Sequence, residues 1–117
     1  MKINGTEAIN ILNKIEPRVK LYKQDRTDKL RSFKIMAKTK NTVFAFDTKT
    51  TTGLFVWINR EPPKMPGLTD IEDIKAKSKS TALDRVFEGC PIKARYKLTI
   101  ENEDAFFDLI SYFENLG

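Results

Sequence analysis

The clearest alternation of apolar and polar positions lies near the end of the chain, over residues 92–100. Apolar residues occupy every second position there and mostly basic residues fall between them, which predicts a strand with one apolar and one basic face. The segment that follows, residues 103–116, carries apolar residues along one side of a helix. Asn102 stands immediately before it, where a side-chain oxygen caps a helix. We therefore expect a strand and a helix that bury their apolar sides in one shared core.

Similar patterns predict the elements that come earlier in the chain. Thr6 is expected to cap a helix over residues 7–15, and Pro17 is expected to end it. Segments rich in alternating, β-branched and aromatic residues predict four strands, over residues 18–24, 30–37, 42–48 and 53–59. Because only short polar links separate these strands, they are expected to pair in an antiparallel order.

The segment 59–80 interrupts this rhythm. Its three prolines and Gly67 exclude a regular element in its first part. The second part has no clear period, although Ile71 and Ile74 permit one helical turn. We expect an irregular loop over residues 59–80, of a length that in compact domains is usually either functional or disordered.

After this loop, a short helix capped by Ser80 or Thr81 is expected to run to Glu88, with Gly89 directly after it. The order of elements is then helix, four strands, loop, helix, strand and helix, which is typical of the α+β class. We expect a single domain over residues 1–117. It would have a mostly antiparallel sheet of about five strands, with the N- and C-terminal helices packed on it.

The composition excludes several kinds of site. The chain has no histidine, which removes the usual partner of a serine or cysteine nucleophile and the commonest metal ligand. Its five glycines are scattered singly, so there is no glycine-rich phosphate loop. Cys90 is the only cysteine, which excludes an internal disulfide and a cysteine-based zinc site. We expect a protein that is not an enzyme and that has no cofactor or metal.

Hydropathy and charge indicate a location and a partner. No run of about 18 apolar residues and no signal-peptide pattern is present, so we expect a cytoplasmic protein without a membrane partner. The last 17 residues carry five acidic and no basic residues; since the whole chain has a formal net charge of +5, residues 1–100 carry +10. A basic body of this kind favours a polyanionic partner, and we expect nucleic acid, DNA before RNA.

Two groups of basic residues are candidates for phosphate contacts. The first lies on the last strand and its expected neighbours, and the second lies in the irregular loop. The residues are Lys93, Arg95, Lys97, Arg18, Lys20, Arg31 and Lys34 in the first group, and Arg60, Lys64, Lys75, Lys77 and Lys79 in the second. Alternatively, lysine on an edge strand prevents unwanted pairing, and a lysine-rich loop is simply solvated. The sequence leaves both interpretations open.

Aromatic residues of two neighbouring strands are candidates for base stacking. We expect Phe44, Phe46, Phe55 and Trp57 to lie on one face of the sheet, opposite the smaller aliphatic residues. If a helix covers that face, the four rings belong to the core. If the face is open, they form a surface on which a base can stack.

Two other functions compete with nucleic-acid binding. A protein-binding inhibitor, such as an immunity or anti-defence factor, would use the same surface or the acidic last helix to mask its partner. In size, charge and α+β pattern alone, the chain resembles small proteins that bacteria and phages use in restriction, DNA defence and counter-defence. More remotely, Asp73 and Lys75 have the carboxylate-x-lysine spacing of metal-dependent nucleases, for which Asp47 or Asp70 would supply a second acid.

Overall fold

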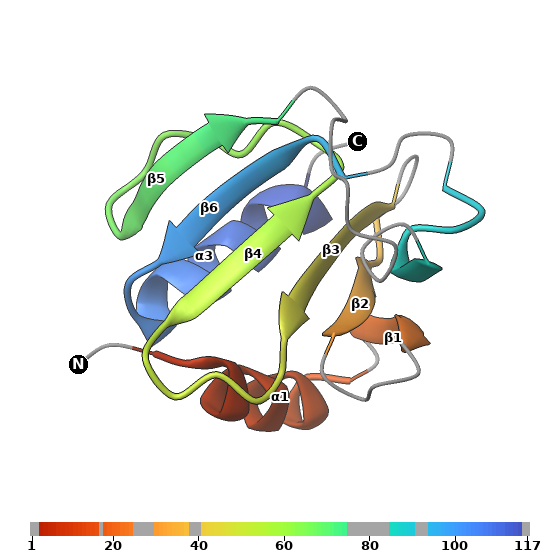
Figure 1. Cartoon of the computed structure of the whole chain (residues 1–117), viewed down its shortest axis with the longest axis horizontal. Helices are drawn as coiled ribbons and strands as arrows, with labels where there is room; N and C mark the ends of the chain where they lie inside the picture. The colour runs from red at the N-terminus through yellow and green to blue at the C-terminus, as the bar shows by residue number, and fades with distance from the viewer. Residues whose placement is uncertain are drawn as a thin grey trace.

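The protein is a single α+β domain with an antiparallel sheet and helices on one side of it (Figure 1). The computed structural model describes residues 3–16, 18–24, 30–37, 41–74, 85–90 and 94–115. The helices and strands are α1 (Gly5–Lys14), β1 (Val19–Gln24), β2 (Leu30–Ile35), β3 (Thr42–Asp47), β4 (Leu54–Ile58), β5 (Leu68–Asp73), β6 (Tyr96–Ile100) and α3 (Glu103–Glu114). The predicted fold class is confirmed, as are the positions of β1 to β4 and α3. The last strand was predicted over residues 92–100, but β6 begins only at Tyr96, because Ala94 packs in a different buried cluster from Leu98 and does not continue the alternation.

The sheet has six strands in the order β1-β2-β3-β4-β6-β5, and every neighbouring pair is antiparallel. The first four strands form the expected antiparallel series. After β4 the chain runs out to the edge of the sheet as β5 and later returns as β6, which inserts between β4 and β5 (Figure 1). The strand with the clearest sequence pattern, β6, is therefore an interior strand of the sheet.

The prediction of about five strands was wrong because β5 was assigned to the irregular loop. Only Leu68 of this strand is buried, so the alternation that identifies a half-buried strand is missing. Asp70 has a φ of 51°, and the pairing with β6 shifts between Thr69 and Glu72, as in a β-bulge. An exposed, bulged edge strand is held mainly by backbone hydrogen bonds. Because these bonds do not depend on residue type, they produce no recognisable pattern in the sequence.

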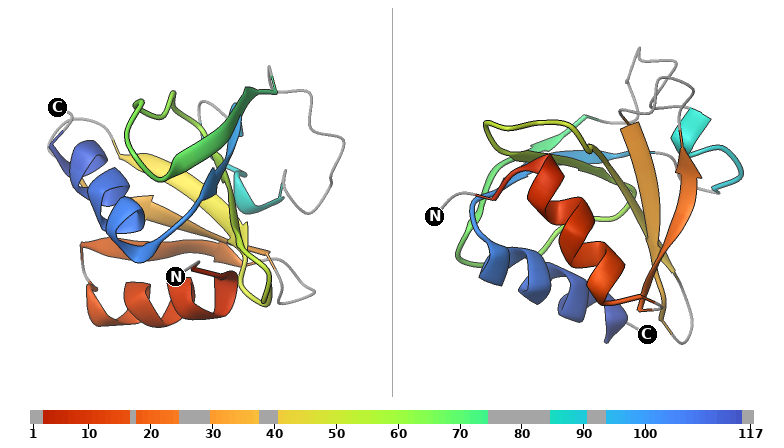
Figure 2. Two further views of the ribbon diagram at one scale, coloured as in Figure 1. Left: turned by 90° about the vertical axis from the view of Figure 1, so that its left-hand side faces the viewer. Right: turned by 90° about the horizontal axis from the view of Figure 1, so that it is seen from below.

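The two described helices pack on the same face of the sheet (Figure 2). We call this the inner face and the opposite one the outer face. The inner face carries the main core, which joins Leu12 of α1 and Phe106 of α3 to Val56 of β4. On the outer face a smaller cluster forms where Val86 and Phe87 cover part of β3. The described residues thus cover most of one side of the sheet and part of the other.

Local sequence explains where both helices begin. The Asn102 side chain accepts a hydrogen bond from the backbone N–H of Ala105 at 2.8 Å, as expected for the N-cap of α3. Helix α1 is capped by Asn4, whose oxygen accepts from the N–H of Glu7 at 2.9 Å. The prediction of Thr6 as the cap was wrong; its hydroxyl instead donates to the Asn4 oxygen at 2.7 Å.

The segment between β5 and β6 is described only in part. The helix expected up to Glu88 lies mostly outside the described residues, as do its proposed caps, Ser80 and Thr81. Within residues 85–90, Val86 and Phe87 are buried as expected. Gly89 has a φ of 86°, the backbone conformation expected of a glycine directly after a helix.

Candidate functional site

The strand register separates the four aromatic residues that were predicted to share a face. Phe44 pairs with Ile58 and Phe46 pairs with Val56, so both phenylalanines lie on the inner face. Trp57 pairs with Ala45 and lies on the outer face. The predicted common face was therefore wrong: side chains alternate along a strand, and a pairing shifted by one residue exchanges the two faces.

Phe44 and Phe46 are core residues, because only 2% and 0% of their surfaces are exposed. Each stacks on Phe33, with ring centroids 5.8 and 5.5 Å away, and Phe44 also makes a T-shaped contact with Phe106, with ring centroids 6.2 Å apart. Their rings have no open face for a ligand. The two candidates for base stacking from β3 are thereby excluded.

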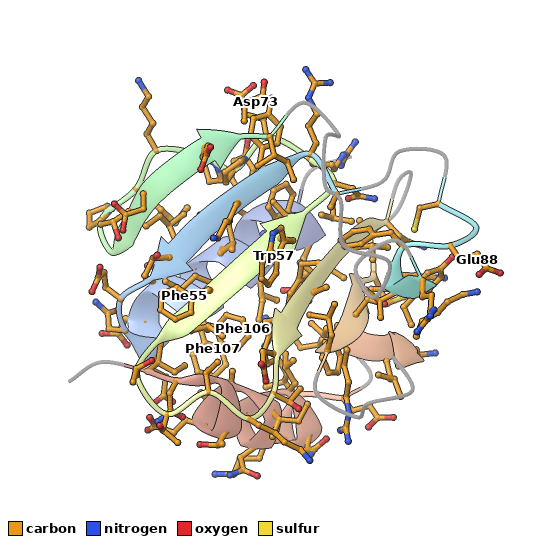
Figure 3. The ribbon with its side chains drawn as sticks, in the orientation of Figure 1. Phe55, Trp57, Asp73, Glu88, Phe106 and Phe107 are labelled. Carbon is orange, nitrogen blue, oxygen red and sulfur yellow. The ribbon has the colours of Figure 1, made fainter. Side chains whose placement is uncertain are left out.

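The other two aromatic candidates, Phe55 and Trp57, lie on the outer face of β4 (Figure 3). Phe55 is 37% exposed, and Trp57 is half-buried against the smaller cluster. Lys97 pairs with Trp57 across β4 and β6, and its Nζ lies 5.5 Å from the centroid of the Trp57 ring. We call Phe55, Trp57 and Lys97 the aromatic platform.

Both acidic and basic side chains lie next to the platform. The Nε of Arg95 donates to a carboxylate oxygen of Asp73 at 3.1 Å, and both side chains are substantially exposed. This hydrogen bond, together with the charge of Asp73, raises the pKa of Arg95. Glu72 faces Lys97 across β5 and β6, but Lys97 forms no ion pair with any carboxylate in the described part of the chain. Among the described basic residues, Lys97 is therefore one whose charge is available at the platform.

A second basic group lies on the outer face at the other end of the sheet. Lys20 and Lys34 pair across β1 and β2, and we call them the basic strand pair. The Nζ of Lys34 lies 5.3 Å from the centroid of the Tyr22 ring. Since Lys20 and Lys34 carry like charges at facing positions, an anion between them would reduce their repulsion.

Tyr22 connects the strand pair to the segment that covers the outer face. Its hydroxyl donates to the backbone carbonyl of Glu88 at 2.6 Å, and Lys23 forms an ion pair with the Glu88 carboxylate at 3.7 Å. The pKa of Tyr22 is raised, first by a hydrogen bond with Cys90 and then by burial. Residues 85–90 are thus tied to β1 and lie between the basic strand pair and the aromatic platform.

Several predicted phosphate-binding residues do not join these groups. The Nε and Nη2 groups of Arg18 donate to the two carboxylate oxygens of Glu114, at the end of α3, at 3.0 and 2.6 Å, and this contact raises the pKa of Arg18. Arg31 pairs with Phe46 and so lies on the inner face. The expected proximity of Arg18, Lys20, Arg31 and Lys34 to the basic residues of β6 was wrong, because β3 and β4 lie between β2 and β6 in the sheet.

The basic candidates of the predicted loop either lie away from the platform and the basic strand pair or fall outside the described residues. Arg60 donates to the hydroxyl of Thr42 at 3.5 Å, near the start of β3, and Lys64 is exposed in the proline-rich segment. The remaining candidates lie outside the described residues: Lys75, Lys77, Lys79 and Lys93. Of the twelve basic candidates, the strand pairings therefore place Lys20, Lys34 and Lys97 on the outer face, with Lys97 apart from the other two. Arg95 directly precedes β6 and binds Asp73 at the end of β5.

The acidic residues considered for a nuclease site form no cluster in the described part of the chain, and two of them bind other groups. Asp73 binds Arg95, and a carboxylate oxygen of Asp47 accepts from the backbone N–H of Lys49 at 2.8 Å. Across the described ranges, no three residues among His, Cys, Asp and Glu lie close enough to hold a metal ion. Lys75, the basic member of that motif, is not described.

Sequence reasoning missed the contribution of β5 to this surface. Thr69 and Glu72 of β5 face Thr99 and Lys97 of β6, so the strand forms one border of the platform. The only signal available was the weak polar alternation after Leu68, which also fits a loop.

Comparison with known proteins found no match: no family model, no curated protein and no solved structure matches this chain. Among the described residues, no helix is both long and apolar enough to cross a membrane.

Proposed function

We propose that the protein is a non-enzymatic module that binds nucleic acid, DNA in the first instance, through the outer face of its sheet. The observation that carries this proposal is the aromatic platform. Phe55 and Trp57 remain partly exposed on a face that the two described helices, α1 and α3, do not cover, and the ammonium group of Lys97 lies against the Trp57 ring.

Each part of the platform has a counterpart in a nucleotide. An aromatic ring can stack on a base, which contributes about 1–3 kcal/mol per base. A neighbouring lysine can contact a phosphate, which adds affinity without sequence preference. The basic strand pair, Lys20 and Lys34, offers a second phosphate contact on the same face. The formal net charge of +5 favours the approach of a polyanion.

The test is a salt titration of binding, measured by fluorescence anisotropy with labelled DNA. Lys34→Ala and Lys97→Ala should each weaken binding and each reduce the salt slope by about 0.7–0.9, the contribution of one phosphate. Lys14→Ala is the matched control, because Lys14 is an exposed lysine in the last turn of α1, on the other side of the sheet. Absence of binding at low salt, or equal effects of all three variants, would contradict the proposal.

The non-enzymatic part of the proposal has its own test. Added Mg²⁺ or Mn²⁺ should produce no cleavage of single- or double-stranded DNA or of RNA, since no acidic cluster for a metal ion forms among the described residues. The control variant is Asp73→Ala. Metal-dependent cleavage by the wild-type protein that disappears in this variant would establish a nuclease.

A second candidate, the protein-binding inhibitor, is favoured by the exposed edge of the sheet. Strand β5 pairs only with β6 among the strands, and Ile71 in it is 40% exposed. An edge of this kind can accept a strand from a partner protein. Binding through backbone hydrogen bonds and apolar contacts would respond weakly to salt, so the same titration separates the two functions.

A further inference from the structure

The proposed function leaves open whether the ligand is a duplex or a single strand. Building on that function, we propose that the aromatic platform binds unpaired bases of a single strand. When a base stacks on Trp57, the ammonium group of Lys97 moves from the Trp57 ring to a phosphate of the same strand.

The outer face of the sheet is too broad to enter a groove of a DNA duplex. Neighbouring strands lie about 4.8 Å apart, so six strands extend over about 24 Å, while the major groove of B-DNA is only about 12 Å wide. The shortest extent of the whole molecule is 27 Å. Because a groove admits a helix or a two-stranded ribbon but not the face of a broad sheet, the platform cannot reach base edges in a duplex.

The platform also offers ring faces, which paired bases cannot use. Bases within a duplex are stacked on their neighbours and show only their edges, whereas unpaired bases can turn a face towards an aromatic side chain. Phe55 and Trp57 are two residues apart on one strand, so their side chains are about 6.8 Å apart. This is twice the rise of about 3.4 Å between stacked bases, so neighbouring bases can each contact one ring only when they are unstacked.

Lys97 decides which kind of ligand the platform accepts. Its Nζ lies 5.5 Å from the centroid of the Trp57 ring, and it has no ion pair among the described residues, although Glu72 faces it from β5. A cationic ligand, the other common occupant of an aromatic surface, would meet this ammonium group on the ring. An anionic ligand with an aromatic part meets attraction from both residues.

The exchange of Lys97 is energetically possible. An exposed contact between a cation and a ring is generally weaker than the stacking of a base on that ring, so a base can displace the ammonium group. The displaced group stays beside the stacked nucleotide because Lys97 and Trp57 are paired across β4 and β6. It then contacts a phosphate of the same strand, where a charge-assisted hydrogen bond replaces the lost contact.

Trp57 is the only tryptophan of the chain, so its intrinsic fluorescence reports directly on the platform. We would titrate the protein with a short single-stranded oligothymidylate, the corresponding oligouridylate, a duplex and an abasic strand of the same length. The single strands should quench Trp57 and bind about tenfold more tightly than the abasic strand for each base stacked. The duplex should leave the fluorescence unchanged.

Variants separate stacking from charge. Phe55→Ala should lower affinity for the single strand and leave the salt slope unchanged, since Phe55 is exposed and uncharged. Lys97→Met keeps most of the side-chain length but removes the charge, and it should reduce the salt slope by about 0.7, one phosphate on a single strand. Lys97→Arg should restore the slope, and Lys14→Met, on α1, should match the wild type.

The possible outcomes distinguish the two proposals. Equal binding of single strand, duplex and abasic strand, without quenching, would overturn the single-strand inference and leave nucleic-acid binding in place. A normal salt slope in Lys97→Met would overturn the exchange of Lys97. Failure of every nucleic acid to bind at low salt would overturn the proposed function itself. Preference for oligothymidylate or for oligouridylate would identify the strand as DNA or RNA.

Discussion

The two faces of the sheet use the same kind of residue for opposite purposes. On the inner face, Phe44 and Phe46 are packed between neighbouring strands and α3 and are almost fully buried. On the outer face, Phe55 and Trp57 come from the adjacent strand but remain partly accessible. Hydrophobicity alone does not separate these four residues. The strand register and the position of the helices decide which rings stabilise the fold and which can meet a ligand.

The coverage of each face explains this division. Two helices supply large apolar side chains to the inner face, so every ring there has partners on several sides. Among the described residues, the outer face is covered by a smaller cluster, to which Val86, Phe87 and Ala94 contribute from outside the strands. A face that is half covered leaves apolar surface in contact with water, which is the usual condition of a binding surface.

The strongest test of this comparison is a pair of matched substitutions. Phe44→Ala should lower the free energy of unfolding by roughly 3–5 kcal/mol, because it removes a fully packed ring. Phe55→Ala should lower it by about 1 kcal/mol or less, because the ring is already partly in water. Urea denaturation followed by circular dichroism measures both. Similar losses in the two variants would mean that the outer face is as well packed as the inner one.

A smaller effect is expected at the hydrogen bond that holds the outer cover. The buried hydroxyl of Ser32 on β2 donates to the backbone carbonyl of Val86 at 2.6 Å. Ser32→Ala leaves that carbonyl without this donor and should lower the free energy of unfolding by about 1–3 kcal/mol. Thr52→Ala, at an exposed position between β3 and β4, is the control and should change little. An unchanged stability in Ser32→Ala would show that this hydrogen bond contributes little to holding residues 85–90, which Tyr22 and Lys23 also contact.

The smallest effect concerns the ion pair between Arg18 and Glu114, beside the inner face. A double-mutant cycle with Arg18→Ala and Glu114→Ala should give a coupling of about 0.2–1 kcal/mol, and it should weaken in high salt, because the pair is partly exposed. The pKa of Arg18 is raised by this hydrogen bond, so its contribution is complete below the ordinary pKa of arginine and is lost only above the raised value. No coupling would indicate that α3 is placed by its apolar contacts only.

Much of the fold follows from local patterns in the sequence. The alternation before Ile100, the capping by Asn102 and the apolar side of α3 depend on residues close together in the chain, and the structure confirms all three. The first four strands were also predictable, since β-branched and aromatic residues mark them. These features could be predicted because backbone geometry repeats every two or every 3.6 residues and selects residue types accordingly.

The sites that the sequence did not determine depend on partners far away in the chain. Strand β5 forms by pairing with the backbone of β6, which comes about 25 residues later in the chain. Arg18 does not lie with the other basic candidates, because it binds Glu114 near the other end of the chain. Most of all, the separation of Phe44 from Trp57 depends on which residues of β3 and β4 stand opposite one another. The sequence determined that both strands would form and be rich in aromatic residues. Only the tertiary structure decided which of their rings face the helices and which face solvent, because a shift of one residue in pairing reverses the faces without changing either strand.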